Sequence, residues 1–286
     1  MKRNSRPSSE IIASARQLLA RGNVREAHDL LLDEGYVERL QPEVQEAFLK
    51  LVPINPTLRA MLDGVYQELD ASTRDVRFKA LTQLAREFAR EHLRDNVRWM
   101  RDPRASEPLI KAVFDPDRKI YDRALIVLSR LVCKYFPDQR SLQAFLLRLA
   151  DRKQETRNRA ISGIGCLRRE QVLSHLVDLM DHGTDRDRAE VSRQVWGLSY
   201  ETWDHMNQHP IEWTEAGRRL WKDKMVAALR DSYVDVRKSA ARALQGLGTH
   251  DTLSALQAAR SAEQNEDVRF YLDETIAAIE KRAPES

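Results

Sequence analysis

The sequence has few of the residues that interrupt helices or cross-link a chain. Only ten glycines, ten prolines and two cysteines occur among its 286 residues, and aromatic residues make up 7%. No run approaches the roughly 20 apolar residues that span a bilayer, and no apolar segment follows the basic N-terminus to form a secretory signal. Composition therefore predicts a helical, cytoplasmic protein that does not enter a membrane.

Chemical motifs are also missing. Cys133 and Cys166 lie in apolar helical patterns and form no C-x-x-C pair, so we expect two buried, reduced thiols. The chain has no glycine-rich phosphate loop, no nucleophile elbow and no zinc-finger spacing. These absences predict a protein that has no cofactor, no metal site and no enzymatic activity.

A spacing of apolar residues recurs along the chain. Asp235-Val236-Arg237 is followed by Ala240 and Leu244, and the same order begins at Asp75-Val76-Arg77. The alanine position of each copy serves as its marker, and the markers are Ala80, Ala124, Ala160, Gln194, Ala240 and Leu272. A second apolar segment and a short turn precede each copy, and strand signals are essentially absent. The repeating unit is thus a helix, a turn and a second helix.

The D-V-R-x-x-A-x-x-x-L pattern resembles the HEAT repeat family over residues 55–283. This resemblance implies an all-α fold, a right-handed α-solenoid of about six helix pairs whose second helices line a concave face. Residues 1–54 lack the motif, and we expect them to form an N-terminal helical cap. Residues 284–286 would be a C-terminal tail.

The stretch TWDHMNQHPIEW, Thr202 to Trp213, lies in the longest interval between markers. His205 and His209 are four residues apart, as zinc ligands on one helix face would be, but Pro210 follows at once and no third ligand is at a firm spacing. We therefore interpret residues 199–218 as an insertion whose tryptophans pack on the solenoid. A contact with a partner is the alternative interpretation.

Basic residues gather on the face of the second helices that lies opposite the buried positions. Its cations are Lys79, Arg86, Arg123, Arg130, Arg159, Arg193, Lys238 and Arg242, against the two acids Asp122 and Glu274. Eight cations and two acids give this face a net charge of +6. Because the whole chain carries only +3, the rest of the chain carries −3 (3 − 6). The alternative is that arginine is simply abundant and partly paired within the stack.

The basic strip predicts a scaffold that binds an acidic protein partner in its concave face. Small HEAT-like proteins similar to this one are interaction platforms, adaptors or toxin-neutralising immunity proteins. The predicted binding residues are the eight cations together with the aromatic residues Trp196 and Tyr200.

Nucleic acid is the alternative partner. The chain is also similar, more weakly, to the alkylpurine DNA glycosylases built from HEAT-like repeats. That resemblance implies that Asp122 would stabilise a cationic sugar and Arg159 would hold a phosphate, with Trp196 as the aromatic residue. Those enzymes have a tryptophan one turn before their aspartate, where this chain has Arg118, and their W-x-x-x-D segment is absent here.

Overall fold

The computed structural model describes residues 7–36, 42–54, 56–91, 102–134, 138–199, 211 and 213–282. Every regular element in these ranges is a helix and none is a strand, which confirms the all-α prediction. None of the helices described has both the length and the hydropathy of a membrane span. The chain divides into two compact units, Met1–Leu147 and Arg148–Ser286, which we describe separately.

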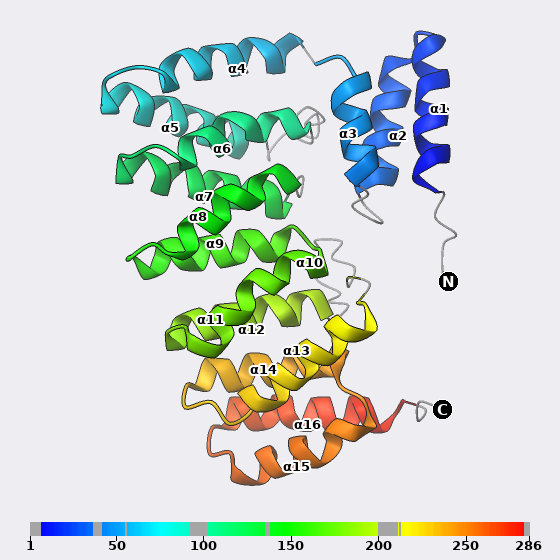
Figure 1. The fold of residues 1–286 in the computed structure, drawn as a ribbon, viewed down its shortest axis with the longest axis vertical. Coiled ribbons are helices and arrows are strands. Elements are labelled where there is room, and N and C mark those ends of the chain that lie inside the picture. The colour runs from blue at the N-terminus through cyan, green and yellow to red at the C-terminus, as the bar shows by residue number, and fades with distance from the viewer. Residues whose placement is uncertain are drawn as a thin grey trace. The chain divides into compact units, whose positions relative to one another are not determined.

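Unit 1 begins with three helices that are followed by two helix pairs (Figure 1). Its elements are α1 (Ser8–Ala20), α2 (Val24–Tyr36), α3 (Pro42–Leu51), α4 (Pro56–Leu69), α5 (Arg74–Glu91), η2 (Pro103–Ser106), α6 (Glu107–Val113), α7 (Arg118–Lys134) and η3 (Gln139–Ser141). The boundary between the units falls within α8 (Leu142–Leu149). The second helices α5 and α7 pack against each other.

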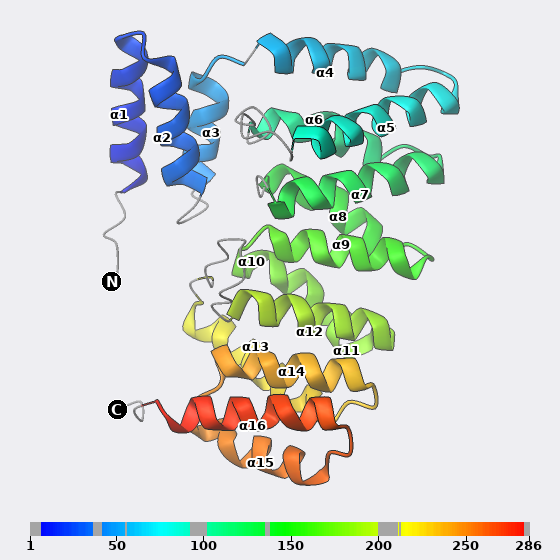
Figure 2. The ribbon, with the colours of Figure 1, turned by 180° about the vertical axis from the view of Figure 1, so that it is seen from behind.

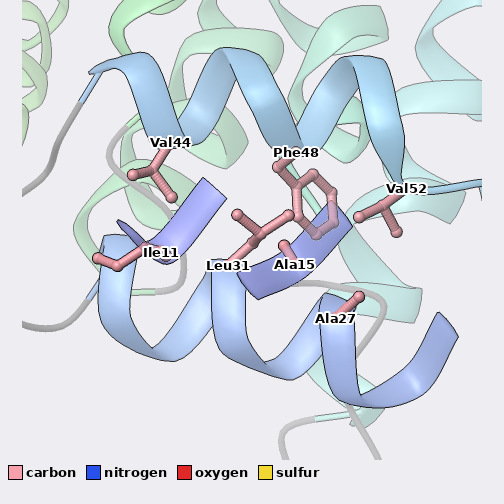
Figure 3. Close-up of a cluster of buried hydrophobic side chains, with 7 residues drawn as sticks. All are labelled: Ile11, Ala15, Ala27, Leu31, Val44, Phe48 and Val52. Atoms are coloured by element: carbon pink, nitrogen blue, oxygen red, sulfur yellow. The ribbon is translucent and has the colours of Figure 1, made fainter. Parts of the chain in front are cut away.

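The first three helices have a hydrophobic core of their own (Figure 3). Its buried side chains, all at most 3% exposed, are Ile11, Ala15, Ala27, Leu31, Val44, Phe48 and Val52. Arg104 links this bundle to the first helix pairs, because its guanidinium donates to the Val52 carbonyl at 3.0 Å and lies 5.4 Å from the centre of the Phe48 ring. The cap function predicted for residues 1–54 stays a prediction.

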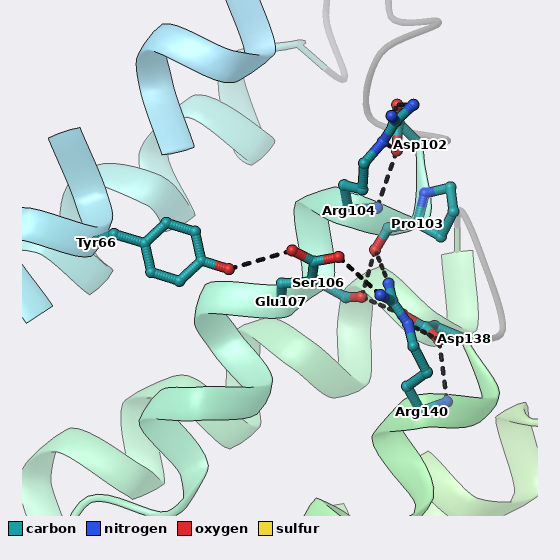
Figure 4. A network of polar contacts seen from close by, with 8 residues as sticks. All are labelled: Tyr66, Asp102, Pro103, Arg104, Ser106, Glu107, Asp138 and Arg140. Carbon is teal, nitrogen blue, oxygen red and sulfur yellow. Dashed lines mark hydrogen bonds and ion pairs between the residues drawn. The ribbon is translucent and has the colours of Figure 1, made fainter. Parts of the chain in front are cut away.

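Two D-x-R segments start the helices that follow (Figure 4). Asp102 accepts hydrogen bonds from the backbone and the side chain of Arg104, and Asp138 accepts the same pair from Arg140. Both carboxylates are 2% exposed. Arg140 also pairs with Glu107 at 2.7 Å, so the start of α8 is tied to the start of α6.

In unit 2, the helices α9, α12, α14 and α16 lie side by side as one layer (Figure 2). Its elements are α9 (Gln154–Cys166), α10 (Glu170–Leu173), η4 (Ser174–Leu176), α11 (Val177–His182), α12 (Asp185–Ser199), α13 (Glu215–Ala228), α14 (Val234–Leu247), η5 (His250–Thr252), α15 (Leu253–Ala262) and α16 (Glu266–Glu280).

One first helix of unit 2 is interrupted. The apolar pattern predicts a continuous helix over residues 172–180, but α10 and α11 are separated there by the 3-10 turn η4. The Ser174 hydroxyl donates to the Gln171 carbonyl at 2.7 Å, a local bond that competes with regular helical hydrogen bonding.

Burial gives the register of the repeats. The sequence predicts Gln194 as the marker of the fourth copy, but Gln194 is partly exposed and Val191 is fully buried. The buried residues of α12 match those of α14 when Val191 is aligned with Ala240: Asp187 with Val236, Ser192 with Ala241, Val195 with Leu244, and Leu198 with Leu247. The predicted marker is therefore wrong by three residues, slightly less than one helical turn.

An arginine three residues before the marker recurs in five of the six copies, and in four of them it makes the same two kinds of contact. These four residues are Arg77, Arg157, Arg188 and Arg237. Arg237 donates to the carbonyls of Asp231 and Ser232, at 2.9 and 3.0 Å, in the turn before its own helix. Its Nε also donates to Glu263, at 2.7 Å, just before the next second helix. A single side chain thus closes one turn and joins it to the next pair.

The other three arginines make the same two kinds of contact. Each donates to a carbonyl oxygen of the preceding turn. Each also pairs with a carboxylate further along the chain, and these acceptors are Asp115, Asp187 and Asp231 in order. We call these four residues the ladder arginines, and one of them lies in unit 1 and three lie in unit 2.

The expectation of two reduced thiols is wrong. Neither Cys133 nor Cys166 is a free thiol in the structure, and both are half-buried. An apolar helical pattern places a side chain near the core but does not determine its oxidation state. The cytoplasmic prediction therefore loses the support that reduced cysteines would have given it.

We expect Arg237→Ala to lower the free energy of unfolding by about 3–5 kcal/mol, because it leaves the Glu263 carboxylate, 5% exposed, without its partner. Urea titration followed by circular dichroism measures this loss. Arg260→Ala is the matched control, since Arg260 pairs with Asp273 on the exposed surface and its loss should cost less than about 1 kcal/mol. Equal losses for the two variants would contradict the proposed importance of the ladder.

The same ion pair predicts a pH dependence. The hydrogen bond from Arg237 lowers the pKa of Glu263 from 4.5 to about 2. A carboxyl whose pKa is lower in the folded state stabilises the fold above its ordinary pKa, and this stabilisation is lost as pH falls through the folded value. The difference in unfolding free energy between the natural chain and Glu263→Gln should therefore shrink as pH falls from 4.5 towards about 2. A difference that does not change with pH would show that the pair is not coupled to folding.

Candidate partner-binding site

Four cations form a patch on the second helices of unit 1, which we call the basic quartet. Lys79 and Arg86 lie on α5, and Arg123 and Arg130 occupy the equivalent positions on α7. The two cations of each helix are seven residues apart, so they share a face and are separated by about 10 Å of helical rise. Packed helices lie about 8–10 Å apart, so the four positions form a roughly square array.

The positive charge of the basic quartet is not compensated by ion pairs within the described ranges. Lys79, Arg86 and Arg130 are exposed, whereas the Nε of Arg123 is buried and has no hydrogen-bond partner there. Asp122, one of the two acids predicted on this face, pairs with Arg118 of its own helix at 3.6 Å. An acceptor from a partner would therefore meet donors that are not engaged.

In unit 2, several members of the predicted strip are already paired. Arg193 donates to Glu190, whose pKa is raised by burial. The Nζ of Lys238 lies 3.2 Å from the Oδ2 of Asp267, so these two residues form an ion pair. Arg159, on α9, is half-buried. Unit 2 therefore presents less uncompensated positive charge than the sequence predicts.

Arg242 is the exception in unit 2, because aromatic rings hold it. Its Cζ lies 3.4 Å from the centre of the Trp196 ring on α12 and 4.7 Å from that of Tyr271 on α16. Lys238 lies 5.4 Å from the same tyrosine ring. Burial lowers the pKa of Arg242, so this guanidinium has lost part of its hydration. We call Trp196, Lys238, Arg242 and Tyr271 the cation–aromatic cluster.

Most of the predicted insertion lies outside the described residues. This applies to Tyr200, Trp203, His205 and His209, so their predicted roles stay predictions. Trp221, beyond the insertion in α13, is 1% exposed and packs in the core of unit 2. The described ranges contain no group of three or more side chains that could hold a metal ion.

The three residues implied by the glycosylase resemblance are divided between the units. Asp122 belongs to unit 1, while Arg159 and Trp196 belong to unit 2. The corrected marker, Val191, places Trp196 about one turn further from the marker of α12 than the predicted marker did. The guanidinium of Arg242 also lies over the Trp196 ring. The catalytic assignment stays a prediction.

The sequence analysis missed two residues that make important contacts in the structure. Arg188 was not recognised as a ladder arginine, although Asp187-Arg188 followed by Val191 and Val195 carries the repeat spacing. Tyr271 was not among the predicted binding residues, although it lies one residue before its marker, at a position equivalent to that of Arg123. Counting back from a buried valine instead of Gln194 would have revealed the first of these.

Comparison with known proteins supports the fold. No family model and no curated protein matches the chain in sequence. A computationally designed armadillo repeat protein for modular peptide recognition is similar in structure, with 17% identity and a TM-score of 0.54 over 76% of this chain and 99% of that one. Another designed armadillo repeat protein has 15% identity and a TM-score of 0.52 over the same shares. Cex1p also has 15% identity and a TM-score of 0.52, over 94% of this chain and 52% of its own.

At such identities these similarities concern the fold alone. The chain has the architecture of an armadillo- and HEAT-like α-solenoid.

The stack of Arg242 on Trp196 can be measured by a double-mutant cycle on unfolding free energy. We expect Trp196→Leu and Arg242→Gln to be coupled by about 0.5–2 kcal/mol, the range for a cation over an indole ring that is partly removed from water. Trp196→Leu combined with Arg193→Gln is the control and should show no coupling, because Arg193 pairs with Glu190 instead. A coupling of zero for the first pair would mean that the stack does not stabilise unit 2.

Proposed function

We propose that the chain is a non-enzymatic scaffold that binds an acidic segment of a partner protein through the basic quartet. The observation that carries this proposal is the arrangement of Lys79, Arg86, Arg123 and Arg130. They occupy equivalent positions on two adjacent helices, and no carboxylate of the described residues pairs with them.

The chemistry of the quartet favours carboxylates. Three of its members are arginines, whose planar guanidinium matches the two oxygens of a carboxylate. In an extended polyproline II segment, residues three apart face the same side and are about 9 Å apart, which is close to the spacing of the quartet.

The fold is consistent with this function. The designed armadillo repeat protein to which the chain is similar is described as made for peptide recognition, and a stack of helix pairs offers the same kind of extended surface. A function as an adaptor or an immunity protein, and a cytoplasmic location, stay finer predictions within the same proposal. Binding of this kind needs no cofactor.

Fluorescence anisotropy with the full chain tests the proposal. The probes are a labelled peptide rich in glutamate and serine, its glutamine counterpart, and a short single-stranded DNA. We expect the acidic peptide to bind and the glutamine peptide not to bind. Lys79→Gln combined with Arg123→Gln should weaken binding roughly 2- to 30-fold, because exposed ion pairs contribute about 0.2–1 kcal/mol each.

Arg74→Gln is the matched control. Arg74 is an exposed arginine of α5 that lies about 140° around the helix from Lys79, so its loss should leave binding unchanged. A loss of binding free energy in the control half as large as that in the double variant, which removes twice the charge, would show that binding follows net charge and not the quartet. If the DNA binds with a steep dependence on salt while the acidic peptide does not bind, the partner is a nucleic acid and our proposal is wrong.

A further inference from the structure

An exposed aromatic ring borders the cation–aromatic cluster of unit 2. Phe270 of α16 is 58% exposed, the most exposed of the large hydrophobic side chains described. Its ring centre lies 5.2 Å from that of Tyr271, in an edge-to-face arrangement. Since Tyr271 also lies beside Arg242, an apolar ring and a guanidinium flank the same tyrosine.

Arg242 differs from the ladder arginines of unit 2. Arg157, Arg188 and Arg237 each pair with a carboxylate, whereas Arg242 has no such partner in the part of the chain that is described. Stacking on Trp196 uses the flat face of the guanidinium and leaves the N–H groups, which lie in its plane, as donors. These donors have lost part of their hydration without gaining an acceptor.

The rings also hold Arg242 in position. A guanidinium packed against Trp196 and Tyr271 has fewer accessible conformations than one in solvent. Binding of a carboxylate would therefore cost less side-chain entropy than binding to a free surface arginine. Tryptophan, tyrosine and arginine are also the residues most often found at the centres of protein interfaces.

The surrounding charges favour one carboxylate over a polyanion. Lys238, the nearest other cation of the cluster, is paired with Asp267. Asp267 and Glu274 are exposed acids of α16 and would repel a chain of phosphates. The surface is thus suited to a single acidic group accompanied by an apolar one.

We propose that Arg242, Tyr271 and Phe270 form a second docking site, separate from the basic quartet, for a short protein segment in which an acidic residue adjoins an aromatic one. The carboxylate accepts hydrogen bonds from Arg242, while the aromatic side chain packs on Phe270 and Tyr271.

Anisotropy titrations of the full chain with labelled glycine- and serine-based peptides test this site. One peptide carries a Glu-Trp pair, and two matched peptides replace either the glutamate by glutamine or the tryptophan by alanine. We expect the Glu-Trp peptide to bind, and each replacement to weaken binding roughly tenfold, the loss of one hot-spot contact.

Variants assign each contact. Phe270→Ala should weaken binding of the Glu-Trp peptide but not of the peptide that lacks tryptophan, and because Phe270 is exposed this variant should fold normally. Arg242→Gln should weaken binding of the Glu-Trp peptide but not of the peptide that lacks glutamate. Arg260→Gln, which removes an exposed arginine of α15, should change neither.

Several outcomes would overturn the inference. These are an absence of binding by the Glu-Trp peptide, equal binding of its glutamine counterpart, and an unchanged affinity in Phe270→Ala. Combined Lys79→Gln and Arg123→Gln should leave binding of this peptide intact. A matching loss in that variant would show that the two sites are not separate.

Discussion

The fold depends on an arginine that does two tasks at once. In Arg237 and its three counterparts, the guanidinium donates to carbonyl oxygens of the turn before its own helix and also pairs with a carboxylate further along the chain. A turn between helices leaves carbonyl groups without intrahelical partners, and a nearly buried acid needs a counter-charge. One side chain satisfies both needs. The same contact therefore closes the turn in four of the helix pairs and joins each of these turns to a residue further along the chain.

The use of some arginines in structural contacts explains which other cations remain for binding. The ladder arginines lie three residues before the marker and are occupied by the fold. Lys79, Arg123 and the cations one heptad later, Arg86 and Arg130, lie on another face of the second helices, and no acid among the described residues pairs with them. In unit 2, the aromatic rings of Trp196 and Tyr271, and not a carboxylate, hold Arg242 in position. The two surfaces therefore offer different chemistry on one kind of scaffold.

The sequence allowed much of the fold to be predicted, because helix pairs leave a simple periodic signal. The spacing of Val236, Ala240 and Leu244 reflects one buried helix face, and it recurs closely enough to place most second helices and their markers. The prediction failed at Gln194, where polar residues occupy the buried positions. Asp187 is buried because Arg157 and Thr184 satisfy it, a partnership that local hydrophobicity does not reveal.

The sequence by itself determined the helical class, the repeating unit and the placement of cations on the second helices, since each follows from residue type and from a period of 3.6. Only the tertiary structure decided which cations are already engaged. Whether Lys238 meets Asp267, whether Arg242 reaches Trp196, and whether Cys133 and Cys166 remain free thiols all depend on neighbours outside the local pattern. Periodicity determines the face on which a residue lies, and packing between helices determines what it meets there.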